Sequence, residues 1–219
     1  MAGHLLSKVR PIRRPHQLSG FSRMIKNIMT QRNDVVRLTP SGKFDGLTVW
    51  LTGLSGAGKS TIAEAVHHVL LEQGCPSEIL DADIFRKSFS PELGFSREER
   101  DQNVRRLGYV ANLLTKHGVI VIVAAISPYR ATRDEIRQTI GRFIEVYVAT
   151  PIDICEQRDV KGLYKKARSG VLRGLTGIDD PYEEPTNPEV RCETHRETLS
   201  ESTQKVMNVI SCLLSVGRS

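Results

Sequence analysis

From residue 46 onward, short apolar runs alternate with longer segments in which apolar residues recur every three or four positions. The apolar runs predict strands at 47–51, 79–80, 119–125, 143–148 and near Val190, and the helical spacing predicts helices at 59–73, 96–117, 130–139 and 199–214. This alternation is typical of βαβ units, in which helices connect parallel strands. We therefore predict an α/β fold of three layers, with a mainly parallel sheet and helices on both of its faces.

Residues 159–188 interrupt this alternation. The segment is rich in Lys, Arg, Gly and Pro and has little apolar periodicity. A connection of this length without regular structure is typically either disordered or functional. Because the segment is rich in cations and accompanies the phosphate-binding motif described below, we predict that it forms a mobile lid.

Charge divides the chain into two parts. The 219 residues carry a net charge of +6, and residues 1–45 contain nine Lys and Arg against two Asp, a net +7, so that residues 46–219 carry −1. A nearly neutral folded part argues against a nucleic-acid-binding surface, because such surfaces are basic. We predict a flexible, basic N-terminal extension at 1–45 and one folded domain at 46–219.

The basic extension has two interpretations, a solvated tail or an organellar targeting or docking segment. No apolar run approaches the roughly 18 residues of a membrane-spanning helix, and the four scattered cysteines lack metal-ligand spacing. We therefore expect a cytoplasmic protein without a membrane or nucleic-acid partner. The oligomeric state stays open, with a homodimer among the alternatives.

A phosphate-binding motif lies between the first predicted strand and the first predicted helix. Gly53-Leu-Ser-Gly-Ala-Gly-Lys-Ser fits G-x-x-x-x-G-K-[ST], whose glycines let backbone N–H groups converge on phosphate oxygens at a helix N-terminus. We predict that Lys59 reaches the β- and γ-phosphates of ATP and that Ser60 ligates Mg²⁺. The predicted ATP-binding residues are Gly53, Ser55, Gly56, Ala57, Gly58, Lys59, Ser60 and Thr61.

Two carboxylates, Asp81 and Asp83, follow the second predicted strand. In a parallel sheet the carboxyl end of that strand points to the same crevice as the phosphate-binding loop. P-loop switches and motors usually carry an Asp after a later strand, but here the run 119–125 is followed by Ile126-Ser-Pro, without a carboxylate. We therefore predict a kinase in which Asp83 orients or deprotonates an acceptor hydroxyl and Asp81 contributes to the metal site.

Six segments together carry a family resemblance. They are Gly53-Leu-Ser-Gly-Ala-Gly-Lys-Ser, Leu93-Gly-Phe-Ser, Arg100-Asp-Gln-Asn-Val-Arg-Arg, Ile126-Ser-Pro, Arg158-Asp-Val-Lys-Gly-Leu-Tyr-Lys-Lys-Ala-Arg and Thr176-Gly-Ile-Asp. In this order, they make residues 46–214 resemble the adenylylsulfate kinase family of P-loop kinases. The resemblance implies transfer of the γ-phosphoryl group of MgATP to the 3′-hydroxyl of adenosine 5′-phosphosulfate (APS), which gives 3′-phosphoadenosine 5′-phosphosulfate (PAPS) in sulfate activation.

The resemblance also implies a set of acceptor residues. Asp83 matches the catalytic aspartate of the family, Phe95 matches an aromatic that stacks on the substrate adenine, and Lys161 matches a lid lysine at the substrate. The other implied acceptor residues are Arg86, Arg100 and Asn103, which match contacts to the phosphosulfate and ribose, together with Ile126, Ser127, Gly174 and Leu175.

Ser127 matches a serine that has been proposed in this family as a phosphorylated intermediate, and it is therefore a candidate catalytic residue. We favour direct in-line transfer, because formation of a phosphoserine would need a base that the motif does not show.

Three positions depart from the family pattern, all on the acceptor side. Asp81-Ala-Asp-Ile replaces Asp-Gly-Asp-Asn, Ala125-Ile-Ser-Pro replaces Phe-Ile-Ser-Pro, and Gly174-Leu-Thr-Gly replaces Gly-Phe-Thr-Gly. The last change removes one of two stacking aromatics, a loss of about 1 to 3 kcal/mol. The acceptor is therefore either APS or another nucleotide conjugate, and we expect Leu175 to lie opposite Phe95. A non-catalytic nucleotide-binding module is a third alternative for the function of the chain. If the acceptor is APS, Leu175→Phe should rebuild the clamp and lower the KM.

Overall fold

The computed structural model of the protein describes residues 46–216. The predicted N-terminal extension at 1–45 lies outside the described residues. The strands are β1 (Leu47–Thr52), β2 (Ser77–Asp81), β3 (Ile120–Ala124), β4 (Phe143–Val148) and β5 (Val190–Cys192). The helices are α2 (Lys59–Glu72), α3 (Ala82–Phe89), α4 (Arg97–Lys116), α5 (Arg130–Ile140), α6 (Ile152–Arg158), α7 (Leu163–Arg168) and α8 (Leu199–Val216).

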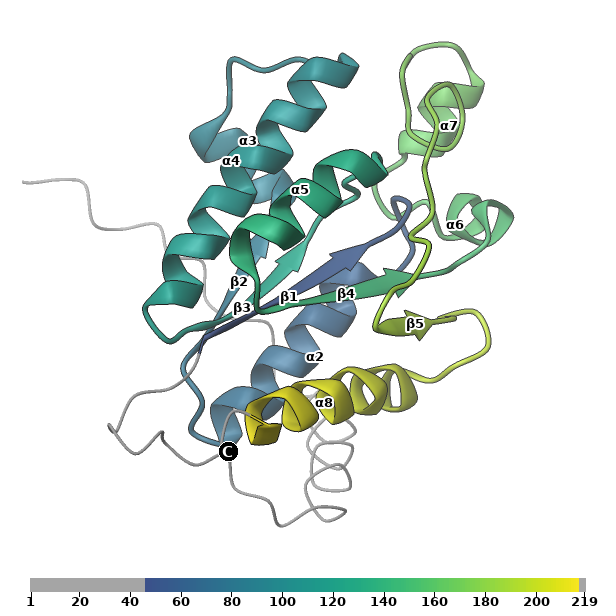
Figure 1. Ribbon diagram of the computed structural model, residues 1–219. Coiled ribbons are helices and arrows are strands. Elements are labelled where there is room, and N and C mark those ends of the chain that lie inside the picture. Colours follow the sequence, from purple (N-terminus) through teal and green to yellow (C-terminus); the bar gives the residue numbers. More distant parts are fainter. Residues whose placement is uncertain (1–45, 217–219) are drawn as a thin grey trace, which may run out of the picture. The chain divides into compact units, whose positions relative to one another are not determined.

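The five strands form one sheet in the order β2-β3-β1-β4-β5, and every neighbouring pair is parallel. In Figure 1, α3, α4 and α5 cover one face of this sheet, and α2 and α8 cover the other. Strands β1, β3 and β4 are buried along their whole length, as expected for parallel strands between two helical layers. The predicted three-layer α/β fold is therefore confirmed.

The core on the side of α4 and α5 centres on Trp50 of β1. Its ring stacks on Phe143 of β4 with 5.9 Å between the ring centroids, and both side chains are buried. The helix α4 that covers them begins at a complete capping box, in which Ser96 and Glu99 satisfy each other's backbone N–H groups. The loops that build the site therefore extend from a rigid sheet.

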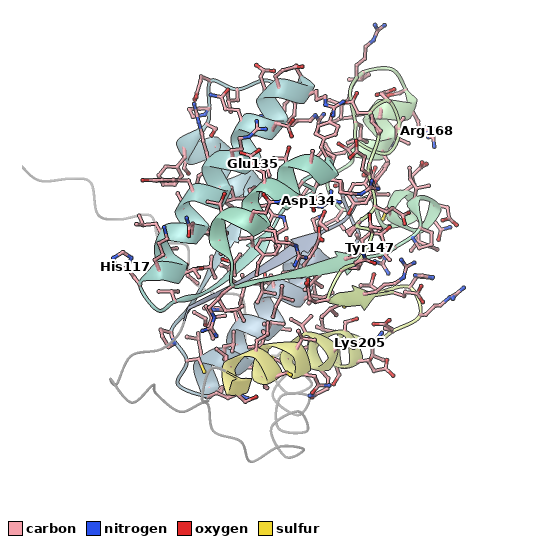
Figure 2. The ribbon with its side chains drawn as sticks, in the orientation of Figure 1. His117, Asp134, Glu135, Tyr147, Arg168 and Lys205 are labelled. Carbon is pink, nitrogen blue, oxygen red and sulfur yellow. The ribbon has the colours of Figure 1, made fainter. Side chains whose placement is uncertain are left out.

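Three short helices were not predicted from the sequence. Helix α3 has eight residues and a single buried side chain, Phe85, so its apolar period is too short to detect. Helix α7 lies inside the predicted lid, and the ion pair between Arg168 of α7 and Glu156 joins it to α6 (Figure 2). The lid segment is thus partly helical. Within the described residues, we find no helix with the length and apolar character needed to cross a membrane.

Candidate active site

A cavity of about 490 Å³ opens at the carboxyl ends of the central strands. Its walls come from the loop between β1 and α2, the residues that follow β2 and β3, the segment 158–164, and the start of α8. Parallel strands explain this convergence, because Asp81 of β2 pairs with Ala124 of β3 and the chain leaves both strands at one edge. The structure thus brings the phosphate-binding loop, Asp83 and Lys161 to one cavity.

The loop between β1 and α2 has the backbone of an anion cradle. Gly58 precedes α2 with φ 107°, in the left-handed region that favours glycine, and no side chain caps this helix. The N–H groups of the first turn therefore remain available to an anion, and the helix dipole favours negative charge there. At Gly53, a Cβ atom would lie 2.6 Å from the carbonyl oxygen of Val148, so only glycine fits between β1 and β4.

Lys59 bends back over this loop. Its Nζ donates hydrogen bonds to the carbonyl oxygens of Gly53 at 2.9 Å and Leu54 at 2.8 Å. Burial lowers the pKa of Lys59 to about 8, the negative charge of Asp83 opposes this shift, and the positive charge of Lys161 adds to it. The ammonium is therefore held in the loop but titrates close to neutral pH.

The lowered pKa of Lys59 predicts that ATP affinity depends on pH. The protonated lysine attracts phosphate, so affinity should be full below pH 8 and should fall as the pH rises through about 8. Between pH 7 and pH 9, the Kd for MgATP should rise about tenfold, because the protonated fraction of Lys59 falls from about nine-tenths to about one-tenth. Calorimetric titrations at both pH values measure this change. The matched control is Lys59→Arg, which stays charged and should flatten the profile, and a flat wild-type profile would contradict the prediction.

Two oxygen atoms that can ligate a metal ion lie close together beside Lys59. The hydroxyl of Ser60 donates to Asp81 Oδ2 at 3.0 Å, and Asp81 Oδ1 accepts the N–H groups of Asp83 and Ile84 as the N-cap of α3. A hydroxyl and a fixed carboxylate are the ligand chemistry that Mg²⁺ prefers. No group of three or more His, Cys, Asp or Glu forms a metal site in the part of the chain that the structure describes. A Mg²⁺ ion at Ser60 and Asp81 therefore needs further oxygen ligands from phosphate or water.

Asp83 follows this pair in the first turn of α3. Its carboxylate accepts a hydrogen bond from Nζ of Lys161, a lid residue 78 positions further along the chain. Both side chains are exposed, and both line the cavity. The predicted catalytic aspartate and the predicted lid lysine are thus direct partners.

Three of the predicted acceptor residues, Phe95, Arg86 and Arg100, form a second cluster. Arg86 lies 4.7 Å and Arg100 5.5 Å from the centroid of the Phe95 ring, which is 61% exposed. Arg100 also donates to the Gly174 carbonyl oxygen, to Thr176 Oγ1 at 3.0 Å and to Asp180 Oδ2 at 3.2 Å. Arg100 therefore links the Phe95 ring to the far part of the lid.

Asn103 lies on α4 and is buried, and no hydrogen-bond partner is found for its Oδ1 atom among the described residues. An unpaired acceptor in a buried position is costly, so this oxygen is available to a donor that the protein itself does not provide.

The structure argues against a catalytic role for Ser127. Its hydroxyl accepts a hydrogen bond from Trp50 Nε1 at 3.0 Å and donates one to Thr52 Oγ1 at 3.1 Å, and the residue is buried. Ile126, and not Ser127, lines the described cavity. A buried hydroxyl with two protein partners and no adjacent base is a poor nucleophile. The geometry favours the direct transfer that the sequence suggested, with Ser127 fixing the loop after β3.

Leu175 was expected opposite Phe95, and the structure shows it as a buried residue. Only 7% of it is exposed, and it does not line the cavity described above. Its carbonyl oxygen accepts the N–H groups of residues 178–180, which closes a tight turn around it. Leu175, which is smaller than the Phe of the family pattern, therefore fills a packed interior position and does not shape an open slot.

This burial reverses the expected effect of Leu175→Phe. We expect the larger ring to overpack the turn and to destabilise the protein by about 1 to 3 kcal/mol, with no tighter binding of APS. Thermal unfolding and the KM for APS measure the two effects. Leu175→Met, which nearly conserves volume, is the matched control and should cost less. A lower KM for APS with unchanged stability would show that residue 175 faces the acceptor after all.

Sequence reasoning missed two cavity residues, Arg158 and Thr194, that hold the phosphate-binding loop in place. Arg158 donates to Thr194 Oγ1 at 2.8 Å and to the carbonyl oxygens of Gly56 and Ala57, each at 3.4 Å. Thr194 itself donates to the Ala57 carbonyl oxygen at 2.8 Å. Arg158 belonged to a quoted motif but had no assigned role, whereas a single Thr in a loop gives no sequence signal.

Known proteins that are similar to this chain identify its family. A family model described as adenylylsulphate kinase matches residues 45–193. The chain belongs to the adenylylsulfate kinase family. An adenylyl-sulfate kinase of Microcystis aeruginosa is 60% identical over 166 residues, which cover 76% of this chain and 92% of that protein. One from a Synechococcus strain is 61% identical over 162 residues, with 74% and 92% covered.

Solved structures of other adenylylsulfate kinases share the fold. The APS kinase of Mycobacterium tuberculosis, solved in complex with AMPPNP and APS, is 43% identical with a TM-score of 0.74, and the match covers 77% of this chain and 99% of that one. An APS kinase from Thiobacillus denitrificans, described as hexameric, is 34% identical with a TM-score of 0.58 over 85% of this chain and 31% of that one. The oligomeric state of the present adenylylsulfate kinase stays a prediction.

Proposed function

We propose that this adenylylsulfate kinase transfers the γ-phosphoryl group of MgATP to the 3′-hydroxyl of APS, giving PAPS and ADP. The observation that carries the proposal is the shared cavity in which Lys59 and Ser60 of the phosphate-binding loop face Asp83 and Lys161. Donor and acceptor groups of a phosphoryl transfer must lie in line within one site, and this cavity supplies both halves. The relatives named above support the choice of substrates.

In the proposed reaction, the oxygen of the acceptor hydroxyl bonds to the γ-phosphorus while the bond from that phosphorus to the bridging oxygen of ADP breaks. Asp83 orients the hydroxyl and accepts its proton, which then passes to solvent. Lys59 and the N–H groups at the start of α2 stabilise the charge on the phosphate oxygens. When bound by Ser60, Asp81 and the nucleotide, Mg²⁺ offsets part of the same charge.

Lys161 has a proposed role in assembling the site. It lies in the segment between α6 and α7, and α7 is fixed to the phosphate-binding loop by the Tyr164 hydroxyl, which donates to the Ser55 carbonyl oxygen at 2.9 Å. The ion pair with Asp83 thus links the acceptor side of the cavity to the loop that holds the donor. An anionic acceptor would compete with Asp83 for this lysine, which leaves the carboxylate free to accept a proton.

The acceptor is tested by measuring ADP formation with APS and with cytidine and uridine diphosphate conjugates at equal concentrations. One observation favours testing a second acceptor. Ile84 replaces the Asn that is usual in the family, and this residue next to Asp83 is 68% exposed. We expect the highest kcat/KM with APS. A higher value with a pyrimidine conjugate would show that this conjugate, and not APS, is the acceptor. Turnover of none of these compounds would favour a non-catalytic module.

The cytoplasmic location of the protein also stays a prediction.

A further inference from the structure

Arg133 of α5 is a buried cation for which the proposed reaction has no role. Its side chain is 1% exposed, yet all three nitrogens of the guanidinium donate to the protein. Nε donates to Glu145 Oε1, Nη1 to the Ser127 carbonyl oxygen and Nη2 to the Glu183 carbonyl oxygen, each at 2.7 Å. One side chain thus joins a central strand, the loop after β3 and the segment that returns from the lid.

The first carbonyl, that of Ser127, directly follows the wall of the active-site cavity. Ile126 lines the cavity, and its carbonyl oxygen accepts a hydrogen bond from Thr52 Oγ1 at 2.7 Å. Ser127 follows with φ 40°, a positive value that costs energy for a residue with a side chain. Such a conformation persists only where the surroundings over-determine it, and the Arg133 bond to the Ser127 carbonyl is one of these restraints.

The second carbonyl belongs to the far end of the lid. The N–H of Glu183 donates to the Pro128 carbonyl oxygen at 2.8 Å, and Glu183 Oε2 accepts the N–H of Arg130 at 2.8 Å. One residue earlier, the Tyr182 hydroxyl lies 2.9 Å from Thr52 Oγ1. The returning lid segment is therefore bound directly to the loop that forms the cavity wall, and Arg133 contacts both.

A structural ion pair would need only the bond between Arg133 and Glu145. Arg137 shows the difference, because it also donates to Glu145, at 3.3 Å, but its other bonds go to Glu189 and not to the cavity wall or the lid. The planar fork of Arg133 matches three acceptors in fixed directions, which a lysine in its place cannot do. Its geometry serves the two backbone segments as much as the buried carboxylate.

We propose that Arg133 is a positioning residue for the acceptor half of the site. It fixes the loop at Ile126 and Ser127 relative to the end of the lid, so that the acceptor hydroxyl lies at Asp83 and in line with the γ-phosphate of the donor. The proposal rests on the proposed function, because it assigns Arg133 to the acceptor of that reaction. It predicts that loss of the fork impairs use of the acceptor and leaves the ATP half intact.

Arg133→Lys tests this by keeping a positive charge for Glu145 and losing the fork. We expect the KM for APS to rise about tenfold and kcat to fall severalfold, while the Kd for MgATP stays within about twofold. Circular dichroism and thermal unfolding establish that the variant is folded. Arg137→Lys is the matched control, because it alters the same Glu145 from the same helix, and it should change the unfolding temperature without changing the KM for APS.

Glu145→Gln keeps the proposal testable if Arg133→Lys does not fold. The amide retains an oxygen for Arg133 Nε but loses the charge that anchors the guanidinium, so the KM for APS should rise about threefold with unchanged ATP affinity. An unchanged KM for APS in a folded variant, or equal losses toward APS and ATP, would overturn the positioning role. Failure of the proposed function is separate, because the wild-type protein would then not turn over APS at all.

Discussion

Replacement of Asp83 by Asn should lower kcat with APS by about 10²- to 10⁴-fold, the range that general acid–base groups contribute. The amide can still orient a hydroxyl but cannot take its proton, so the loss falls on the chemical step. The Kd for MgATP should change less than about threefold, because Asp81, which caps α3 and contacts Ser60, remains in place. Steady-state kinetics and calorimetry on one preparation give both quantities.

The control for Asp83→Asn is Asp134→Asn. Asp134 is an exposed carboxylate on α5, labelled in Figure 2, and it lies outside the residues that line the cavity. Its replacement changes the net charge equally and should leave kcat unchanged. If Asp83→Asn instead weakens MgATP binding by orders of magnitude with little change in kcat, Asp83 is a metal-site residue and not the base.

A double-mutant cycle with Lys161→Met separates the two partners of the Asp83 ion pair. Because Asp83 and Lys161 contact each other, their effects on kcat should be non-additive, with a smaller loss for the second replacement than for the first. Fully additive effects would show that the contact with Lys161 does not contribute to the function of Asp83.

The parts of the fold that depend on periodicity could be predicted from the sequence. The buried run of β3 and the long amphipathic α4 are apolar patterns that admit one interpretation, and the position of the phosphate-binding loop between β1 and α2 follows from its glycines. Helix α3 was not predicted in this way, because an eight-residue helix with one buried residue, which begins at the Asp81 cap, is too short to give a clear apolar period.

The donor and acceptor halves of the site also differ in how well the sequence predicts them. The donor half is a continuous motif, so its residues are close in space because they are close in sequence. The acceptor half joins residues from distant segments, such as Arg100 with Gly174 and Asp83 with Lys161. Asp83 was predicted from its place after a strand, whereas the sequence supplied the other three only through the family resemblance. Resemblance identifies a position but not its burial, which is why Ser127 and Leu175 were expected to face the acceptor and are buried in the structure.

Arg133 shows what neither kind of reasoning provides. An arginine in an amphipathic helix is usually a solvent-exposed residue, and although Arg133 shares the face of α5 that carries Ile136, the local pattern names no partner for a buried cation. Its three acceptors lie in three different segments of the chain, and two of them are backbone carbonyls that carry no sequence identity. Only the folded arrangement shows that these segments share one cation.

Lys59→Ala should lower kcat by about 10²- to 10³-fold or more, and it should also raise the KM for ATP. The ammonium stabilises charge on the transferring group, and loss of one such donor in a preorganised site has costs of this size. The same side chain bonds the carbonyl oxygens of Gly53 and Leu54, so its loss also loosens the loop that binds ATP. The control is Lys116→Ala, an exposed lysine in the last turn of α4.

Lys59→Met separates the ammonium group of Lys59 from the length and packing of its side chain. Methionine keeps most of the length and packing of the side chain but removes the charge and the hydrogen bonds to both carbonyls, so a fall in kcat equal to that of Lys59→Ala assigns the effect to the ammonium. Lys59→Arg restores the charge with the wrong shape and should recover ATP binding more than kcat, because a guanidinium cannot take the place of a compact ammonium between two carbonyls and a phosphate. Turnover within about threefold of wild type in Lys59→Met would remove the ammonium from the transition state and with it the phosphate-loop mechanism.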